Sequence, residues 1–215
     1  MPNLGENVEP QIKNQILNGS EYIEKFCKSQ ILATNRYGWP EIEGKHTYQQ
    51  DLQAVNPLYL TGDMCYQNNC QRCVIAYEAR RRGYDVCAKP YLFRTTDLLQ
   101  YDDQKGWPSI FVNSVLEPCG ANSSKDLKAN IYSKMKSWGE GSRAIVAVDF
   151  QQGYGHVFVA EYINGIVHYM DPQNAQLDCE EYFEIINTRT AVILRTDNCV
   201  LSDQVKECCE GIADR

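Results

Sequence analysis

An Asn-Gly dipeptide at positions 164 and 165 constrains the fold of this chain more than any other feature of its sequence. It separates two apolar runs rich in β-branched residues, 156–163 and 166–171. Asn-Gly is a strong signal for a two-residue hairpin turn, because both central residues of that turn need a positive φ. Ile163 is then expected to face Ile166, and this pair sets the register of the whole hairpin. The sequence therefore predicts an antiparallel hairpin and also which of its side chains share a face.

The rest of the chain divides into a first part rich in predicted helices and a second part rich in predicted strands. Helical spacing of apolar residues, capping residues and terminal glycines indicate helices over 71–82, 124–138 and 178–186, with two shorter ones within 9–33. Strands are expected over 84–93, 143–150 and 191–195, and residues 36–63 are expected to be irregular. Helices followed by an antiparallel sheet predict the α+β class, with N-terminal helices packed on the sheet. We expect a main domain over 51–200, a helical and irregular extension over 1–50 and a tail over 201–215.

Composition narrows the class of protein. With 215 residues, 43% of them hydrophobic, the chain has room for one domain with a substantial core. Its net charge of −7 argues against a nucleic-acid binder, and apolar runs of at most five residues argue against a membrane span. The N-terminus does not resemble a secretory signal, so we expect a protein made in the cytoplasm. Among ten cysteines only Cys70 and Cys73 have a spacing typical of metal ligands, so we expect free thiols and no metal.

A cysteine at the expected start of the helix over 71–82 is the first candidate for a chemical role. Cys70 directly follows Asn68 and Asn69. The unpaired backbone N–H groups and the positive dipole end of a helix N-terminus stabilise a thiolate. The amide of a neighbouring asparagine can donate a hydrogen bond to an oxyanion. The alternative is that Cys70 and Cys73 are small core residues at the start of a helix.

The predicted hairpin brings a histidine and a carboxylate together. Because side chains alternate along strands, we expect one face of the hairpin to carry His156, Phe158, Asp171 and Gln173. On that face, His156 and Asp171 are diagonal neighbours. That face is also apolar, and a buried aspartate needs a partner. His156 is the obvious partner. The alternative is a histidine satisfied at a sheet edge, with Asp171 as part of a turn.

Two stretches of the sequence resemble a known family. The resemblance is to the papain-fold toxin domain family of protein-glutamine deamidases, which occurs in polymorphic bacterial toxins and fused to phage head proteins. The two similar stretches are NNCQRCVIAYEARRRGYDV, over 68–86, and GHVFVAEYINGIVHYMDPQ, over 155–173. The similarity extends over roughly 56–197. It rests on a set of motifs: Asn-Cys-x-x-Cys leading into a helix that ends in Arg-Arg-Arg-Gly, Gly-His opening a strand, and Asp-Pro-Gln closing the hairpin.

The resemblance implies a papain-like cysteine hydrolase fold over the main domain and a Cys-His-Asp catalytic triad. Carried onto this sequence, the triad is Cys70, His156 and Asp171, with Asn69 as an oxyanion donor and Gln173 as a supporting polar group. Cys73 is the alternative nucleophile, because papain-like proteases with a Cys-Gly-Ser-Cys run use the second cysteine. We favour Cys70 because the dipole effect is largest at the first position of the helix. Such a triad needs neither a metal nor an organic cofactor.

The activity implied by the resemblance is hydrolysis of a glutamine side-chain amide in a target protein, through a thioester intermediate. The same triad would also serve a papain-like cysteine protease, a deubiquitinase-like isopeptidase or a transglutaminase. A third interpretation is a non-catalytic structural domain of a phage or toxin particle. The expected partners are a glutamine-bearing protein substrate and either an immunity protein or a component of the delivery or phage particle, which implies delivery into a target cell or carriage in a phage. Nucleic acid and membrane are not expected partners.

Overall fold

The computed structural model describes residues 37–92 and 106–212. The chain divides into two units, Met1–Gly38 and Trp39–Arg215, and the description below concerns the second. The two helices predicted within 9–33 lie outside the described residues. The helices of the second unit are α2 (Tyr48–Val55), α3 (Met64–Gln67), α4 (Cys70–Arg81), α5 (Ser124–Trp138) and α6 (Val205–Cys208), with 3₁₀ helices η2 (Tyr59–Thr61), η3 (Trp107–Ile110) and η4 (Glu180–Glu184).

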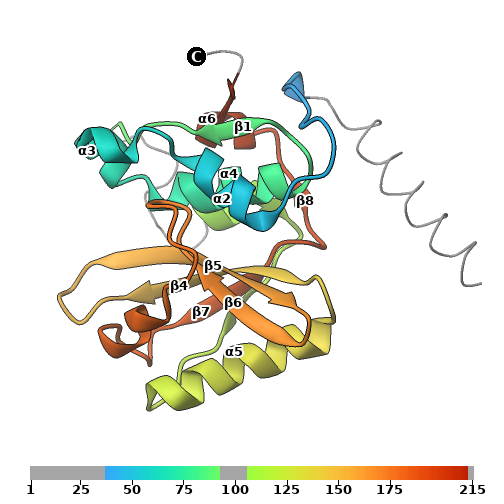
Figure 1. The fold of residues 1–215 in the computed structure, drawn as a ribbon. Coiled ribbons are helices and arrows are strands. Elements are labelled where there is room, and N and C mark those ends of the chain that lie inside the picture. The colour runs from blue at the N-terminus through green and yellow to red at the C-terminus, as the bar shows by residue number, and fades with distance from the viewer. Residues whose placement is uncertain (1–36, 93–105, 213–215) are drawn as a thin grey trace, which may run out of the picture. The chain divides into compact units, whose positions relative to one another are not determined.

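The centre of this unit is a five-stranded antiparallel sheet in the order β3-β7-β4-β5-β6. Its strands are β3 (Leu116–Pro118), β4 (Arg143–Asp149), β5 (Gly155–Ile163), β6 (Ile166–Met170) and β7 (Val192–Arg195). Two small antiparallel pairs lie apart from it: β1 (Val86–Ala88) with β9 (Cys209–Gly211), and β2 (Phe111–Val112) with β8 (Val200–Leu201). Figure 1 shows α5 along one face of the sheet, with α2 and α4 on the other side. The α+β prediction is therefore confirmed.

The predicted hairpin is confirmed residue by residue. Ile163 pairs with Ile166, and the ladder continues in the expected register to Val159 and Met170. Asn164 and Gly165 both have positive φ values, 53° and 79°, as the tight turn requires. The local chemistry of two turn residues thus places the paired side chains of β5 and β6, whereas the ladder stops before Asp171, which bridges Gln176 instead.

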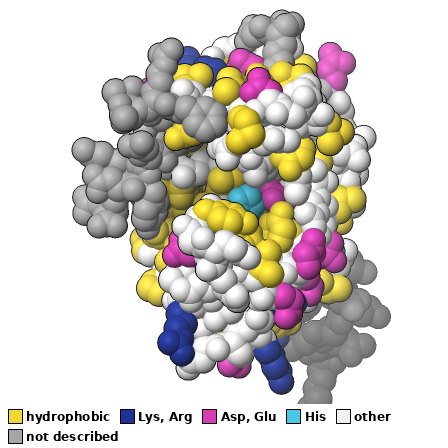
Figure 2. Space-filling view, turned by 90° about the vertical axis from the view of Figure 1, so that its left-hand side faces the viewer, with side chains coloured by type: hydrophobic (Ala, Val, Ile, Leu, Met, Phe, Trp, Pro, Cys, Tyr) yellow, Lys and Arg dark blue, Asp and Glu magenta, His cyan; other side chains and the backbone are white. Residues whose placement is uncertain are grey.

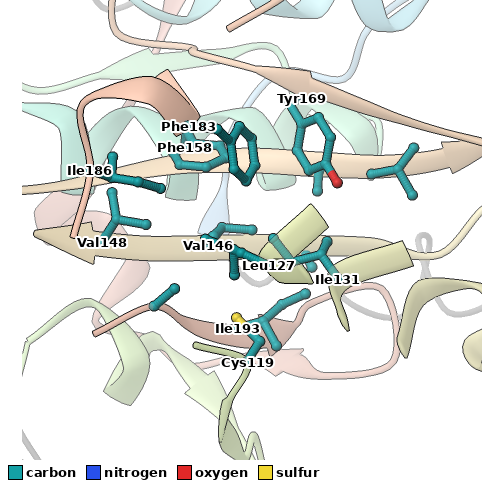
Figure 3. Close-up of a cluster of buried hydrophobic side chains, with 14 of the residues drawn as sticks. Cys119, Leu127, Ile131, Val146, Val148, Phe158, Tyr169, Phe183, Ile186 and Ile193 are labelled. Atoms are coloured by element: carbon teal, nitrogen blue, oxygen red, sulfur yellow. The ribbon is translucent and has the colours of Figure 1, made fainter. Parts of the chain in front are cut away.

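Helix α5 covers one face of the sheet because its sequence fixes both its ends and its apolar stripe. The Ser123 hydroxyl caps its first turn by accepting a hydrogen bond from the Asp126 backbone N–H at 3.2 Å. Its buried residues Leu127, Ile131 and Met135 recur at helical spacing and pack against the β-strands. Figure 3 shows this core, with aromatic rings from β5, β6 and η4 above the helix.

Helix α4 lies against the opposite side and carries three consecutive arginines. Each of them meets a buried carboxylate from a different element: Arg80 pairs with Asp51 of α2, Arg81 with Glu161 of β5, and Arg82 with Glu78 of α4 itself. The run at 80–82 is therefore part of the packing between elements and is not a basic surface patch.

Four predictions of local structure differ from the structure. The segment 36–63, predicted to be irregular, contains α2, whose capping box is formed by Thr47 and Gln50. The strand predicted over 84–93 is only the three-residue β1, and it pairs outside the main sheet. The helix predicted over 178–186 is the shorter 3₁₀ helix η4. Residues 201–211, expected as a tail, contain α6 and β9 with Val205, Cys208 and Cys209 buried.

Candidate active site

Cys70 is the first residue of α4, one residue earlier than the predicted start of that helix. Its side chain is half-buried. Within the described ranges, the backbone N–H groups of Cys70 and Gln71 have no hydrogen-bond acceptor, whereas those of Arg72 and Cys73 bond to the Asn69 carbonyl. The thiol therefore lies beside two backbone donors that are available to an anion, as expected at a helix N-terminus.

Cys73 lies one turn further along α4 and has a different environment. Its side chain is fully buried and donates to the Asn69 Oδ1 atom at 3.2 Å. Burial, with smaller contributions from Cys70 and Asp171, raises its pKa well above the ordinary value of a thiol. A buried thiol with a raised pKa is a poor nucleophile at neutral pH.

His156 occupies the second position of β5, at the end of the strand that β6 does not reach. The ladder between β5 and β6 stops at Val159, so within the described residues the first four positions of β5 lack a β6 partner. The Nε2 atom of His156 lies 2.9 Å from the Oδ2 atom of Asp171, and both side chains are almost completely buried. The histidine and the aspartate that the hairpin pattern placed on one face are therefore in direct contact.

Asp171 is held in a tight turn rather than in the extended ladder. Its backbone forms a two-way bridge with Gln176, at 2.9 and 3.0 Å. Its Oδ1 atom accepts a hydrogen bond from the Gln173 backbone N–H at 2.8 Å, which is an Asx turn. Its Oδ2 atom accepts from His156 and also from the Tyr182 hydroxyl, at 2.7 Å. The carboxylate thus has fixed partners on both oxygens.

The electrostatics of His156 reflect its two polar neighbours. Burial opposes the charged imidazolium, but the hydrogen bonds to Asp171 and Cys70, together with the negative charge of both groups, raise the pKa of His156 to about 10. A histidine with this pKa is protonated at neutral pH. His156 is therefore a charged ring with Asp171 and Cys70 as its two polar neighbours, the arrangement that a cysteine nucleophile and its base require.

Asn69 and Gln173 contribute differently from what we expected. The Asn69 amide donates to the Lys89 carbonyl at 3.2 Å, and its oxygen accepts from Asn56 at 3.1 Å and from Cys73. The Gln173 side chain donates to the Gln67 carbonyl at 2.9 Å and, within the described part of the chain, makes no hydrogen bond to His156. Both amides therefore bond to other segments of the chain around the site.

Asn56 and Tyr182 belong to the site, and the sequence analysis missed both. The buried Asn56 amide donates to Asn69 just before α4 and to the Gln173 carbonyl at 2.8 Å, so it ties the helix start to the turn that carries Asp171. Tyr182 comes from η4, and its ring packs edge-on against His156 with centroids 5.6 Å apart. No periodic pattern marks either residue. Asn56 follows a helix that was not predicted, and Tyr182 follows an irregular turn.

The surroundings of the site are apolar at the surface. Figure 2 shows one face of the molecule, on which hydrophobic side chains and an acidic one surround a histidine. Met64 of α3, Tyr154 before His156 and Leu177 after Gln176 are all exposed. A separate cavity of about 440 Å³ lies beside η4 and the start of α5, and no member of the predicted triad lines it.

The described part of the chain has neither a cluster of metal ligands nor a membrane-spanning helix. No group of three or more His, Cys, Asp and Glu side chains there could hold a metal ion. No described helix is both long enough and apolar enough to cross a bilayer.

Comparison with known proteins agrees with the resemblance seen in the sequence. No curated protein and no solved structure gives a significant match to the chain. A family model described as papain fold toxin 1, glutamine deamidase, matches residues 68–176. The matched segment covers half of the chain and includes Cys70, His156 and Asp171. The chain therefore belongs to the papain fold toxin 1 family of glutamine deamidases.

Proposed function

We propose that this protein is a cysteine-dependent amidohydrolase with a papain-like catalytic core, and that it deamidates a glutamine side chain of a target protein. Cys70 is the nucleophile, His156 the proton carrier and Asp171 the group that orients His156. The observation that carries the proposal is the position of His156, which is bonded to Asp171 at 2.9 Å and whose pKa is raised by both Asp171 and Cys70 as neighbours. Membership of the glutamine deamidase family supports an amide as the bond attacked.

The first half of the reaction forms a thioester. The Cys70 thiolate attacks the side-chain amide carbon of the glutamine, and the carbonyl oxygen becomes an oxyanion beside the backbone N–H groups of Cys70 and Gln71. The His156 imidazolium gives its proton to the amide nitrogen, the C–N bond breaks and ammonia leaves. His156 is then neutral and can act as a base.

The second half releases the product. His156 removes a proton from a water molecule, whose oxygen attacks the thioester carbon. The C–S bond breaks, and the substrate now carries a glutamate. The thiolate and imidazolium are regenerated, so the net change is one water consumed and one ammonia released. Asp171 keeps the Nε2 atom of the ring occupied throughout, so the other nitrogen faces the reacting atoms.

The partner in this proposal is a protein. The exposed hydrophobic side chains around the site offer contact area for a folded surface that presents a glutamine. The target protein enters as substrate, and no metal or organic cofactor takes part in the reaction.

Peptide mass spectrometry of a proteome incubated with the protein tests the proposal. Wild-type protein is expected to convert particular glutamines to glutamates, and Cys70→Ala and His156→Ala are each expected to abolish the conversion. Cys73→Ala is the matched control, since it removes a buried thiol from the same helix and should keep the activity. Cleaved chains would favour a protease and cross-linked chains a transglutaminase. Identical proteomes from wild type and Cys70→Ala would favour the non-catalytic interpretation.

A further inference from the structure

We propose that Tyr182 is a positioning residue of this site, whose hydroxyl holds the Asp171 carboxylate and limits how strongly that carboxylate binds His156. The proposal rests on the proposed function, because it concerns the same Cys70, His156 and Asp171. It adds a fourth group, from a different element of the fold, that neither the family match nor the sequence motifs assign.

The contacts of Tyr182 involve both members of the His-Asp pair. Its hydroxyl donates to the Asp171 Oδ2 atom at 2.7 Å, and this oxygen is the one that lies 2.9 Å from His156 Nε2. Its ring meets the imidazole edge-on, at an interplanar angle of 76°. One side chain therefore restrains the position of the carboxylate and the tilt of the histidine ring at the same time.

Tyr182 is itself held firmly. Its ring packs edge-on against Phe150 and Phe158, with centroids 5.7 and 6.0 Å apart. Its hydroxyl oxygen accepts from the Asn174 amide at 3.4 Å, and its proton has the Asp171 Oδ2 atom at 2.7 Å as a much nearer acceptor than the Gln176 Oε1 atom at 3.3 Å. Burial and the negative charge of Asp171 raise the pKa of Tyr182, so the hydroxyl remains a donor over the whole working range of pH.

Helix η4, which carries Tyr182, is joined to α5 by two side-chain contacts. The Ser124 hydroxyl donates to the Phe183 carbonyl at 2.5 Å, and Lys128 forms an ion pair with Glu180 at 2.7 Å. The hydroxyl of Tyr182 is thus fixed by the α5 side of the domain, whereas Cys70 is carried by α4 on the other side.

The shared oxygen determines the chemical effect. A carboxylate oxygen that accepts a phenol donor has less negative charge available for a second donor. Removing the hydroxyl leaves Oδ2 to His156 alone, so Asp171 binds the imidazolium more strongly and His156 releases its proton less readily. The proton transfer to the leaving group then becomes slower. Tyr182 thus limits how strongly the Asp171 carboxylate holds the proton of His156, and it also fixes the positions of both groups.

The test is the titration of His156 followed by ¹⁵N NMR of the imidazoles, which is practical because the chain has only three histidines. Tyr182→Phe is expected to raise the pH at which His156 loses its proton by roughly one unit. Tyr169→Phe is the matched control, because it removes a hydroxyl from the same aromatic cluster without touching Asp171. It should leave the titration of His156 unchanged. In an Asp171→Asn background, Tyr182→Phe should have no further effect, since the hydroxyl acts through the carboxylate.

An unchanged titration of His156 in a folded Tyr182→Phe protein would overturn the proposal and leave Tyr182 as a packing residue. An equal shift in the Asp171→Asn background would also overturn it. The rate at which iodoacetamide alkylates Cys70 separates this failure from failure of the proposed function. If wild-type Cys70 reacts no faster than an ordinary thiol at neutral pH, the catalytic ion pair itself is absent, whatever Tyr182 does.

Discussion

Glu78 joins the helix that carries Cys70 to the sheet that carries His156, so its removal should lower the stability of the fold. The side chain is 2% exposed and lies in the second half of α4. Its two oxygens accept from Arg143 of β4 at 2.9 Å, from Arg82 at 2.8 Å and from the Thr196 hydroxyl at 2.9 Å. The carboxylate therefore bonds to two guanidinium groups and a hydroxyl in a buried place.

The effect of Glu78→Gln on stability follows from the pKa of this carboxyl group. Burial alone would raise the pKa, but the charges and hydrogen bonds of Arg143 and Arg82 outweigh burial and lower it from 4.5 to about 2. Each pKa unit corresponds to about 1.4 kcal/mol, so the charged form gains about 3 kcal/mol on folding. Removing one partner of a buried ion pair typically costs about 3–5 kcal/mol, because the other charges are left unpaired. We expect Glu78→Gln to lower the free energy of unfolding by about 3 kcal/mol at neutral pH.

Urea denaturation of wild type and Glu78→Gln at several pH values measures this contribution. Because the pKa is lower in the folded state, the contribution is complete above the unfolded pKa of 4.5 and is lost as the pH falls from there toward 2. The difference between the two proteins should shrink over that range. Glu180→Gln is the matched control, since its ion pair with Lys128 is largely exposed, and it should cost less than about 1 kcal/mol. A difference for Glu78→Gln below that of the control, or one that does not change between neutral and acid pH, would refute the reasoning.

Two further predictions concern the thiols and a tight contact of the backbone. Iodoacetamide at neutral pH should label Cys70 well before Cys73, since Cys73 is fully buried and its pKa is raised, and peptide mass spectrometry of the labelled protein checks the order. Preferential labelling of Cys73 would reverse the assignment of the nucleophile. Gly120→Ala should lower the melting temperature and cost about 1–3 kcal/mol, because a Cβ atom there would lie 2.3 Å from the Arg189 carbonyl oxygen. Gly155→Ala is its control, since a Cβ there meets nothing closer than 3.6 Å, and equal melting temperatures for the two variants would contradict the expectation.

The parts of the fold that the sequence predicted well are those that local chemistry determines. The turn at Asn164 and Gly165 set the register of β5 and β6, and Ser123 with Gly139 set the ends of α5. Helix α2 carried a local signal that the prediction overlooked, the capping box of Thr47 and Gln50, whereas other missed features depend on distant partners. Strand β1 pairs with β9, which lies more than a hundred residues away in the chain. No local pattern could have predicted that pairing.

The same division applies to the candidate site. Alternation along the hairpin was enough to place His156 and Asp171 on one face, and the helix start was enough to single out Cys70. The orientation of the amide side chains of Asn69 and Gln173 was not predictable, because each bonds to a backbone carbonyl supplied by another segment. Tyr182 reaches Asp171 only through the turn that the chain makes after β6, and that turn is not periodic.

The Asp-Pro-Gln run at 171–173 explains why the site lies where it does. Pro172 has no backbone N–H to donate, so the β6 ladder cannot continue regularly through it, and the chain turns back at Asp171 toward Gln176. The turn leaves the first residues of β5, including His156, without a β6 partner on one side, while β4 pairs with them on the other. The Gln173 side chain and carbonyl then bond to Gln67 and Asn56, which brings the start of α4 to the uncovered end of β5. The three residues 171–173 thus end β6, place the Asp171 carboxylate and position the start of α4. A change at Pro172 should therefore disturb the positions of Cys70 and Asp171 together.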